Sequence, residues 1–256
     1  MKISIITVTY NSAQTLQDTI NSVLGQTYPD IEYIIIDGKS TDGTVDIIKK
    51  NEPKFNGKMK WISESDNGIY DAMNKGIAMT TGDVIGILNS DDIYIYDNVI
   101  SDIIAVFEKE NVDSVYANLN FVSPQDANKI VRQWKSSVYK TGSFKKGWHP
   151  PHPAFFVKKE CYKKYGLFDS SFKISADFEL MLRFIEKNGI STYFFDKFIV
   201  SMRYGGESTG SLKKIIVGNK NVMKAFKKNN IPVSLFYPIS RIIPKIKNKI
   251  YYKLKK

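Results

Sequence analysis

The sequence is poor in the two side chains that most often carry nucleophilic and metal chemistry. Its 256 residues include one cysteine, Cys161, and two histidines, His149 and His152. A single cysteine excludes an intramolecular disulfide and a cysteine-based zinc cage, and it favours a reducing compartment. We interpret Cys161 as a small buried hydrophobic residue.

Two kinds of segment are also missing. No uninterrupted apolar run reaches the roughly 18 residues that a membrane-spanning helix needs. The start at Met1 lacks the apolar region and the small-residue site of a cleavable signal. Neither a G-x-G-x-x-G turn nor a P-loop lysine motif occurs. We therefore expect a cytoplasmic protein in which side chains and a metal ion, instead of a glycine-rich loop, hold any nucleotide.

Acidic residues are absent from the last part of the chain. Residues 211–256 hold 13 Lys and Arg and no Asp or Glu, whereas the remainder holds 24 basic and 26 acidic residues. The net charge of +11 therefore lies entirely in this segment, which we call the basic tail. A nearly neutral body argues against a nucleic-acid partner, and the basic tail favours contact with an anionic surface.

The basic tail also carries apolar and aromatic side chains that interleave with its lysines. This pattern is typical of helices that lie in the interface of an anionic membrane. Pro238 and Pro244 would divide such a helix into short pieces. The alternative is a solvated surface helix followed by a frayed end. The apolar residues are Leu212, Ile215, Ile216, Val222, Met223, Phe226, Leu235, Phe236, Tyr237, Ile239, Ile242, Ile243, Ile246, Ile250, Tyr251 and Tyr252.

The first 110 residues alternate between short apolar runs and helical patterns. The runs at residues 2–9, 31–36, 59–63 and 84–88 are rich in β-branched residues, as strands buried on both faces are. Helical patterns lie between them, and we expect Ser12 to be the N-cap of the first. Short βα units of this kind predict an α/β fold with a parallel sheet and right-handed crossovers.

The pattern changes after residue 110. A helix at 98–108 precedes short strands at 114–118, 120–122 and 130–134, which we expect in a mixed or antiparallel arrangement. We therefore divide the chain into a body at 1–210, with a first half at 1–110 and a second half at 111–210, and the basic tail. The second half continues with a strand at 154–157, helices at 158–165 and from 175, a strand at 192–203 and a glycine-rich loop at 204–210.

Acidic residues follow three of the four expected parallel strands. Asp37, Asp66 and the pair Asp91-Asp92 stand at carboxyl ends, where an open α/β sheet binds its ligands. Carboxylate oxygens suit Mg²⁺ or Mn²⁺ and, through the metal, a diphosphate. An isolated Asp-Asp pair is more often a solvated turn. Acidic residues at three neighbouring strand ends favour a ligand site instead.

Six segments of the sequence resemble family 2 glycosyltransferases of the GT-A fold, in the same order and spacing. The resemblance extends from about residue 3 to residue 206. The chain looks most like bacterial enzymes that add a sugar to a growing surface polysaccharide. The first half would then bind the nucleotide-sugar (the donor half) and the second would bind the acceptor (the acceptor half). The segments are SIITVTYNS, IIIDGKSTDGT, ESDNGIYDAMNKG, GDVIGILNSDD, HPAFF followed by GLFD, and SADFELMLR.

The resemblance implies where the base and ribose of the donor bind. Thr9, Tyr10 and Asn11 match the segment that lines these groups, and Asp37 matches the family's base-binding aspartate. A carboxylate at this position accepts the imide N–H of uracil, which predicts a UDP-sugar. The alternative for Asp37 is a helix or turn cap.

A second stretch resembles the part of the family that closes over the nucleotide. Asp66, Gly68 and Ile69 match this stretch, and Asn74 and Lys75 lie about one helical turn further on. Lys75 is a candidate for a phosphate contact. The alternative is that Lys75 belongs to a solvated helix face.

Asn89, Ser90, Asp91 and Asp92 match the Asp-x-Asp-Asp motif of the family. The match implies that Asp91 is the main ligand of a Mn²⁺ or Mg²⁺ ion, and that Asp92 supports it or contacts the sugar. Asn89 keeps an oxygen acceptor but lacks the charge of the aspartate that it replaces.

Asp177 matches the catalytic base of the family, with Ala176 in place of the glutamate that precedes it there. The alternative is that Asp177 caps its helix. Glu179 is the second candidate for the base, although two residues along a helix it faces away.

Two further residues are candidates for contacts with the diphosphate or the acceptor. His149 and His152 lie in one loop, which can reach the diphosphate or the metal in this fold, and we prefer His152 to His149 for this contact. Arg203, together with the Gly205-Gly206 loop, can order over the donor once it binds and exclude water.

These features together predict a metal-dependent, inverting hexosyltransferase. It would move a sugar from a UDP-sugar to a hydroxyl of a polyprenyl-diphosphate-linked glycan at the inner face of a bacterial cytoplasmic membrane, in O-antigen or capsule synthesis. A catalytically silent glycan- or membrane-binding relative is the alternative that Asn89 and Ala176 suggest. A nucleotidyltransferase is a further alternative, which a glycine-rich, basic loop after the first strand would favour.

Overall fold

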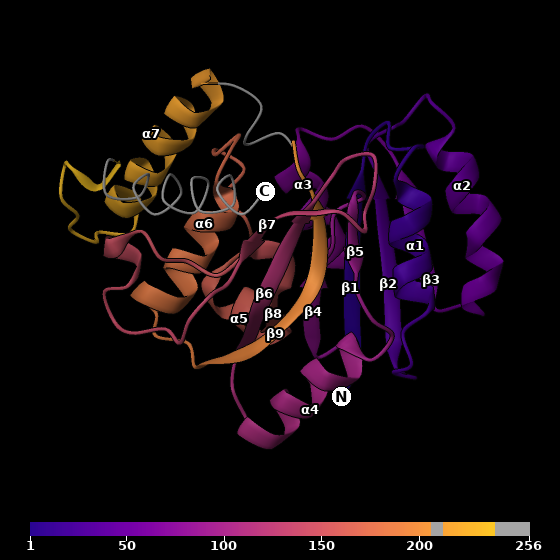
Figure 1. Ribbon diagram of the computed structural model, residues 1–256, viewed down its shortest axis with the longest axis horizontal. Coiled ribbons are helices and arrows are strands. Elements are labelled where there is room, and N and C mark those ends of the chain that lie inside the picture. Colours follow the sequence, from indigo (N-terminus) through magenta and orange to yellow (C-terminus); the bar gives the residue numbers. More distant parts are fainter. Residues whose placement is uncertain (206–211, 239–256) are drawn as a thin grey trace.

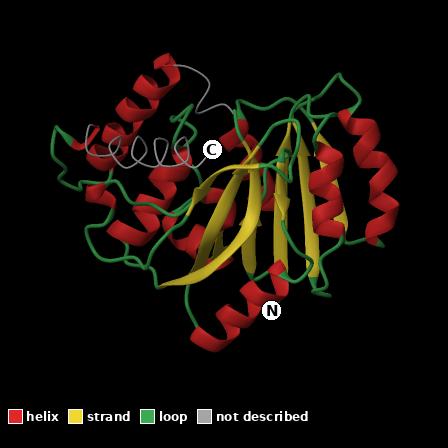
Figure 2. Ribbon diagram, in the orientation of Figure 1, coloured by secondary structure: helices red, strands yellow, loops and turns green. Residues whose placement is uncertain are grey.

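The computed structural model of the chain describes residues 1–205 and 212–238. A single nine-stranded sheet runs through the molecule, and helices cover both of its faces (Figures 1 and 2). The strand order is β3-β2-β1-β4-β8-β6-β9-β5, and β7 pairs with β6 beside this path. The mixed α/β architecture expected from the sequence is confirmed.

The first four strands form the parallel part of the sheet. Thr9 pairs with Asp37, and Asp37 pairs with Ser63, so the carboxyl ends of three strands lie level with one another. The strands are β1 (Ile3–Thr9), β2 (Ile31–Asp37), β3 (Met59–Ser63) and β4 (Val84–Ile87). The helices between them are α1 (Leu16–Leu24), α2 (Thr44–Asn51, continued by η1 at Glu52–Phe55) and α3 (Ile69–Met79).

The remaining strands make the sheet mixed. β8 (Phe155–Lys158) runs antiparallel to β4 and β6, whereas β6 (Ser114–Val122) runs parallel to β9 (Thr192–Arg203). β6 is one continuous strand where the sequence suggested two. β5 (Asp92–Tyr94), which the sequence did not predict, pairs with the end of β9, and β7 (Ile130–Trp134) lies at the edge.

The helices of the second half gather at one end of the sheet, away from α1 and α2 (Figure 1). α6 begins at Ala176, close to the expected start, and continues into a π-helical turn at Leu182–Lys187. The other elements are α4 (Val99–Glu110), α5 (Lys159–Tyr165), α7 (Leu212–Lys228), η2 (Phe144–Lys146) and η3 (His152–Ala154).

Two hydrophobic layers hold the helices on the sheet. α1, α2 and α4 pack on one face, and α3, α5, α6 and α7 pack on the other. α3 lies very close to the sheet because Gly76 faces β1: a Cβ at this position would lie 2.5 Å from Cγ2 of Ile6. This close packing fixes the start of α3 relative to the carboxyl ends of β1 and β2.

The first turn of the chain after β1 differs from the expectation. Ser12 does not cap α1, because the helix begins at Leu16 and Thr15 precedes it. The Ser12 carbonyl accepts the N–H groups of Thr15 and Leu16, and the Ser12 hydroxyl bonds to the Tyr10 carbonyl. Ser12 therefore stabilises the loop between β1 and α1 and is not the N-cap of α1.

The described part of the basic tail packs on the acceptor half. Val222, Ala225 and Phe226 of α7 are buried, and Asn221 donates a hydrogen bond to the carbonyl of Ile174, just before α6. Among the described residues, no helix is both long and apolar enough to cross a bilayer. The loop at 206–211 and the tail residues 239–256 lie outside the described residues.

Candidate active site

Asp37 stands at the end of β2 and is fully buried. Its carboxylate accepts hydrogen bonds from the N–H and the hydroxyl of Ser40, at 3.0 and 2.5 Å, and from the hydroxyl of Ser63, at 2.6 Å. Asp37 therefore closes the turn after β2 and joins it to β3. The predicted contact with a base would require Asp37 to exchange one of these partners.

The β1 end forms a second set of contacts with the same turn. Asn11, in the left-handed region at φ +48°, donates its N–H to the Ser40 hydroxyl and accepts the N–H of Thr41 through its side chain. These bonds stabilise the loop and leave Tyr10 projecting outwards, 65% exposed. Thr9 lies buried beneath, and its hydroxyl has no hydrogen-bond partner among the described residues.

Asp66 lies over the turn that Asp37 closes. A Cβ at Gly38 would lie 2.7 Å from Oδ2 of Asp66 and 3.3 Å from the Tyr10 ring, so the absence of a side chain at Gly38 makes room for both. Oδ1 of Asp66 accepts the N–H of Gly68, whereas Oδ2 accepts no hydrogen bond within the described part of the chain. The Tyr10 ring and Oδ2 of Asp66 therefore both lie next to Gly38, in the space that a side chain there would fill.

The stretch after Asp66 leads directly into α3. Gly68, at φ +109°, precedes the helix, and Ile69, its first residue, is 43% exposed. Lys75 forms ion pairs with Glu64 (2.8 Å) and Asp71 (3.8 Å), and the hydrogen bond that it donates to Glu64 raises its pKa. The predicted phosphate contact of Lys75 is therefore in competition with two carboxylates.

Asn74 reaches into the acceptor half. Its side chain accepts the N–H of Phe168 and donates to the carbonyl of the same residue, both at 2.9 Å. This pair of bonds fixes the turn Gly166-Leu167-Phe168-Asp169. Asn74, predicted to contact the nucleotide, instead connects α3 to a segment more than ninety residues away.

The segment Asn89–Asp92 links β4 to β5. Asn89 donates a hydrogen bond to Oδ2 of Asp92 (3.2 Å), and Ser90 bonds to the hydroxyl of Ser12 (2.9 Å). Oδ1 of Asn89 and Oδ1 of Asp92 are both buried, and neither has a hydrogen-bond partner within residues 1–205 and 212–238. Buried oxygen atoms without a partner are costly, which indicates that a ligand satisfies them.

The charges of this segment oppose one another. Asp92 is only 1% exposed, and burial, together with the neighbouring Asp91, raises its pKa well above the usual range. Burial also raises the pKa of Asp91, against the opposing effect of Arg203. A nearby cation lowers the electrostatic repulsion between two neighbouring carboxylates.

Arg203 supplies part of the positive charge that stabilises Asp91 and Asp92. Its guanidinium donates to the Asp91 carbonyl (3.4 Å) and to the carboxylate of Asp18 on α1 (2.6 Å). Arg203 stands where β9 pairs with β6, beside β5, so the end of β9 brings it to the segment Asn89–Asp92. The predicted place of Arg203 near the donor is consistent with these contacts, and its orientation by Asp18 was not predicted.

The residues present fit a divalent cation. Asp91, Asp92 and Asn89 offer only oxygen atoms, which Mg²⁺ and Mn²⁺ prefer, and two of these oxygens have no partner. In the described part of the chain, no three Asp, Glu, His or Cys side chains are grouped closely enough to hold a metal alone. A metal here would take further ligands from the diphosphate.

Asp177 lies in the first turn of α6 and is half-buried. Its Oδ1 accepts a hydrogen bond from the hydroxyl of Tyr70 at 3.1 Å, and no described residue donates to its Oδ2. Tyr70 is in the first turn of α3, at the carboxyl end of β3. Asp177 is therefore brought to the edge of the sheet where Asp37 and Asp91 stand.

His152 lies on the side of Asp177. Its ring meets the ring of Phe168 edge-on, with centroids 5.6 Å apart, and Phe168 in turn stacks on Tyr70. Burial lowers the pKa of His152, although the charge of Asp177 opposes this effect. These contacts place His152 beside Phe168 and near Asp177, and its contact with the diphosphate or the acceptor stays a prediction. His149 packs against Trp134 and Phe178.

Glu179 is excluded as an alternative base by its surroundings. It is 2% exposed, and it pairs with Arg183 (3.0 Å) and accepts a hydrogen bond from Asn229 (3.0 Å). Its carboxylate therefore connects α6 to the end of α7. The second candidate from the sequence is structural.

Three residues of this arrangement were missed by sequence reasoning. Tyr70 and Phe168 lie inside the quoted segments ESDNGIYDAMNKG and GLFD but carry no recognisable chemistry alone, and Asp18 is an unremarkable helix residue. Only the spacing of Tyr70 and Asn74, one helical turn apart, indicated that both face the same neighbour.

Comparison with known proteins identifies the family of the chain. The family model described as Glycosyl transferase family 2 matches residues 4–165. An uncharacterized glycosyltransferase from Nostoc sp. is 32% identical over 174 residues, which are 64% of this chain and 53% of the relative. The chain thus spans about half the length of that relative.

Two solved structures share the fold. Staphylococcus aureus TarS in complex with UDP-GlcNAc gives a TM-score of 0.68 at 17% identity, over 93% of this chain and 69% of that chain. A mannosyltransferase from Pyrobaculum calidifontis in complex with GDP-Man and Mn²⁺ gives 0.66 at 18%, over 93% and 68%. The chain has the GT-A fold that its sequence predicted. Since the family model covers more than half of the chain, this protein belongs to glycosyltransferase family 2.

Proposed function

We propose that this protein moves a sugar from a UDP-sugar to a hydroxyl of a glycan acceptor and inverts the anomeric centre. The observation that carries the proposal is the common edge of the sheet. It holds an acidic segment with two unpartnered oxygens at Asn89 and Asp92, and an oriented carboxylate at Asp177. The first suits a diphosphate with its cation, and the second suits a proton acceptor.

The donor base would bind above Gly38. Tyr10 offers an exposed ring for stacking, and Asp66 offers a free carboxylate oxygen to an N–H of the base. The resemblance assigned this N–H contact to Asp37, whose oxygens already have partners within the fold. Uracil and guanine both present an N–H, so GDP-mannose is the sharpest competitor for a UDP-sugar.

A Mn²⁺ or Mg²⁺ ion would be held by Asp91 and Asp92, with the side-chain oxygen of Asn89 beside them. Such an ion, when bound, neutralises the diphosphate and makes the nucleotide a better leaving group. The protein itself contributes Arg203, which Asp18 and the Asp91 carbonyl hold against this segment. Its positive charge would stabilise the negative charge that develops on the diphosphate as the bond to the sugar breaks.

Asp177 would accept the proton of the attacking hydroxyl. Its Oδ1 accepts the hydrogen bond from Tyr70, which would leave Oδ2 for the acceptor hydroxyl. The hydroxyl oxygen attacks the anomeric carbon from the face opposite the diphosphate, the glycosidic bond to the diphosphate breaks, and the proton passes to Asp177. One displacement inverts the centre, so an α-linked donor gives a β-linked product.

The acceptor would be lipid-linked, and the protein would work at the inner face of the cytoplasmic membrane in the synthesis of a surface polysaccharide. Support comes from the described part of the basic tail. Leu235 and Phe236 are 86% and 75% exposed, and Ile216 on α7 is 57% exposed. Lysines 220 and 227 line shallow hollows of about 400 Å³ along α7. Exposed apolar residues among lysines suit an anionic membrane.

The decisive experiment is a panel of nucleotide sugars, including UDP-sugars and GDP-mannose. Each is incubated with the protein and Mn²⁺ or Mg²⁺, with and without EDTA, and released nucleoside diphosphate is measured. We expect metal-dependent release of UDP from one donor. Silence across the panel, repeated with a polyprenyl-diphosphate sugar as acceptor, would favour a catalytically silent glycan- or membrane-binding relative. Release of pyrophosphate from a nucleoside triphosphate and a sugar phosphate would instead favour a nucleotidyltransferase.

A further inference from the structure

One face of α3 contacts the acceptor half at two points. Tyr70 donates its hydroxyl to Asp177 across 107 residues of sequence, and Asn74, one turn later, fixes the backbone of Phe168. The Tyr70 ring stacks on the Phe168 ring, with centroids 5.7 Å apart and an angle of 23°. The two contacts reinforce each other because Asn74 holds the ring on which Tyr70 rests.

The Tyr70 hydroxyl donates a hydrogen bond to Asp177. A tyrosine hydroxyl is protonated at neutral pH, and burial together with the adjacent Asp177 raises the pKa of Tyr70 well above its usual value. Asp177 is faced by Tyr70 from α3 and by the buried His152 from η3. On its own helix, the nearest charged group, Glu179, is already paired with Arg183 and Asn229.

The backbone before Asp177 also needs support. Ser175, which precedes α6, has φ +71°, a conformation that a serine adopts at a cost. Ala176 follows it and offers no side chain that could orient the base. The orienting contact therefore comes from another element, and the hydroxyl of Tyr70 supplies it.

We propose that Tyr70 is the positioning residue of the base, and that through it the donor half orients Asp177. This inference rests on the proposed function. Tyr70 holds Oδ1 of Asp177 so that Oδ2 points to the acceptor hydroxyl. Because α3 begins at Gly68 and Ile69, directly after Asp66, the same helix end meets the donor and the base. Ala176, which precedes Asp177, has no polar group that could orient the base. The hydroxyl of Tyr70 takes this role instead.

The test is Tyr70→Phe, which keeps the ring on Phe168 and removes only the hydroxyl. With the donor identified by the panel, we expect kcat for transfer to fall by about 10- to 100-fold, the effect of one lost hydrogen bond to a charged group. The KM for the donor and the slow hydrolysis of the donor by water should not change. An unchanged kcat would overturn the proposal.

The matched control is Tyr96→Phe. Tyr96 also donates its hydroxyl to a carboxylate, that of the partly exposed Asp102 on α4, at 2.9 Å. We expect its kcat to stay within about twofold of the unaltered protein. An equal loss in both variants would show a general effect of removing such hydroxyls, and would also overturn the proposal.

A double-mutant cycle separates positioning from stability. If Tyr70 acts through Asp177, Tyr70→Phe should have no further effect on transfer in an Asp177→Asn background. A loss of the same size in both backgrounds would show that Tyr70 acts on the fold alone. The unaltered protein is the reference throughout: if it releases no nucleoside diphosphate from any donor, the proposed function fails before the role of Tyr70 is reached.

Discussion

The donor half and the acceptor half build their parts of the site in different ways. In the donor half, residues at the ends of neighbouring parallel strands bond to one another: Asp37 to Ser40 and Ser63, and Asn11 to Ser40. In the second half, Asp177 is held from outside that half, since it accepts a hydrogen bond from Tyr70 on α3. The contacts of Asp37 therefore depend on neighbouring strands, whereas the orientation of Asp177 depends on how α3 packs against the second half.

This difference places stability and catalysis in different contacts. α6 is held by Glu179, which pairs with Arg183 and accepts from Asn229 after α7. Arg183 also donates to the carbonyls of Gly166 and Leu167, so one ion pair connects α6, α7 and the turn on which Tyr70 rests. Disturbance of this ion pair should move the base without touching the donor site.

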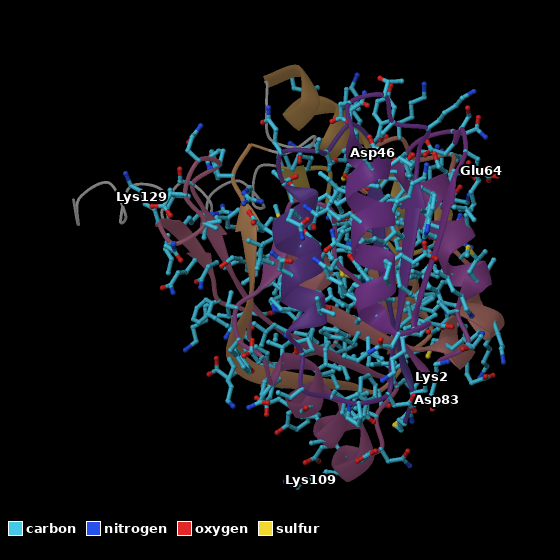
Figure 3. The ribbon with its side chains drawn as sticks, turned by 90° about the vertical axis from the view of Figure 1, so that its right-hand side faces the viewer. Lys2, Asp46, Glu64, Asp83, Lys109 and Lys129 are labelled. Carbon is cyan, nitrogen blue, oxygen red and sulfur yellow. The ribbon has the colours of Figure 1, made fainter. Side chains whose placement is uncertain are left out.

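The largest expected effect is on the donor side. Asp91→Asn removes the main charge offered to the cation, and we expect transfer to fall roughly 10⁴-fold, because metal stabilisation of the leaving group is worth several kcal/mol. Donor hydrolysis should fall in parallel. The control is Asp46→Asn, which removes an exposed carboxylate on α2, a helix that carries none of the candidate metal ligands (Figure 3). Retained, EDTA-sensitive transfer in Asp91→Asn would remove this residue from the metal site.

Asp177→Asn should affect only one of the two halves. We expect kcat for transfer to fall roughly 10²- to 10⁴-fold, the usual contribution of a general base, with donor affinity kept. Isothermal titration with the nucleoside diphosphate and Mn²⁺ measures that affinity. A parallel loss of donor binding would mean that the two halves are not separable in this way.

Glu179→Ala should break the acceptor half as a structure. Truncation leaves the Arg183 guanidinium, which is 14% exposed, without its carboxylate, and we expect the unfolding free energy to fall by about 3 kcal/mol, the lower end of the range for buried pairs. Urea denaturation measures the change. The control is Glu160→Ala, which removes an exposed pair with Lys163, for which we expect less than about 1 kcal/mol. Similar values for both variants would contradict the structural role of Glu179.

Asp66 and Asp37 offer the sharpest test within the donor half. Asp66→Asn should raise the KM for the donor about tenfold, the effect of about 1.4 kcal/mol of lost binding, and leave stability unchanged. Asp37→Asn should lower the unfolding free energy by about 1–3 kcal/mol, because a buried acceptor of three hydrogen bonds is disturbed. If Asp37→Asn changes only the KM for the donor, the contact with the nucleotide base would be assigned to Asp37 and not to Asp66.

The smallest effect is expected at the amino ends of the strands, the end of the sheet opposite the candidate site. Figure 3 shows Lys2 beside Asp83 at this end, distant from Glu64 at the carboxyl end of β3. Burial alone would raise the pKa of Glu32, but bonds from Lys60, Thr81 and Ser4 lower it to about 2. The folded-state pKa is depressed, so this contribution is present above about pH 4.5 and is lost as the pH falls towards 2. Glu32→Gln should flatten the stability profile in that window.

Measurement of urea midpoints between pH 2 and pH 6 checks this expectation. A profile for Glu32→Gln that runs parallel to that of the unaltered protein would show that Glu32 does not drive the loss. Transfer activity at neutral pH should be the same in both, because Glu32 lies at the amino ends of the strands, away from the site.

The parallel part of the fold was readable from the sequence because its signals are local. Short β-branched runs separated by helical patterns determine β1 to β4, and polar residues follow each run at the edge where ligands bind. The start of α6 near Asp177 was also predicted within one residue. Asp37, Asp66 and Asp91 do stand at the carboxyl ends of the strands, where the sequence predicted them.

What remained unpredicted depends on partners far apart in the chain. β5 has three residues and forms only because β9 pairs with it, so no local pattern announces it. The sequence placed Asn74 and Lys75 near the nucleotide, whereas tertiary contacts engage Asn74 with Phe168 and Lys75 with Glu64. Amide and ammonium groups suit either use, and only the fold decides between them.

The close approach of α3 to the sheet has a consequence for recombination between relatives. Gly76 fits α3 against Ile6 of β1, while Tyr70 and Asn74 present the acceptor half with its contacts. A chimera that exchanges everything after residue 110 would keep α3 from one parent and receive Phe168 and Asp177 from the other. If the second half selects the acceptor, as we propose, its specificity can be transplanted only together with the face of α3 that carries Tyr70 and Asn74.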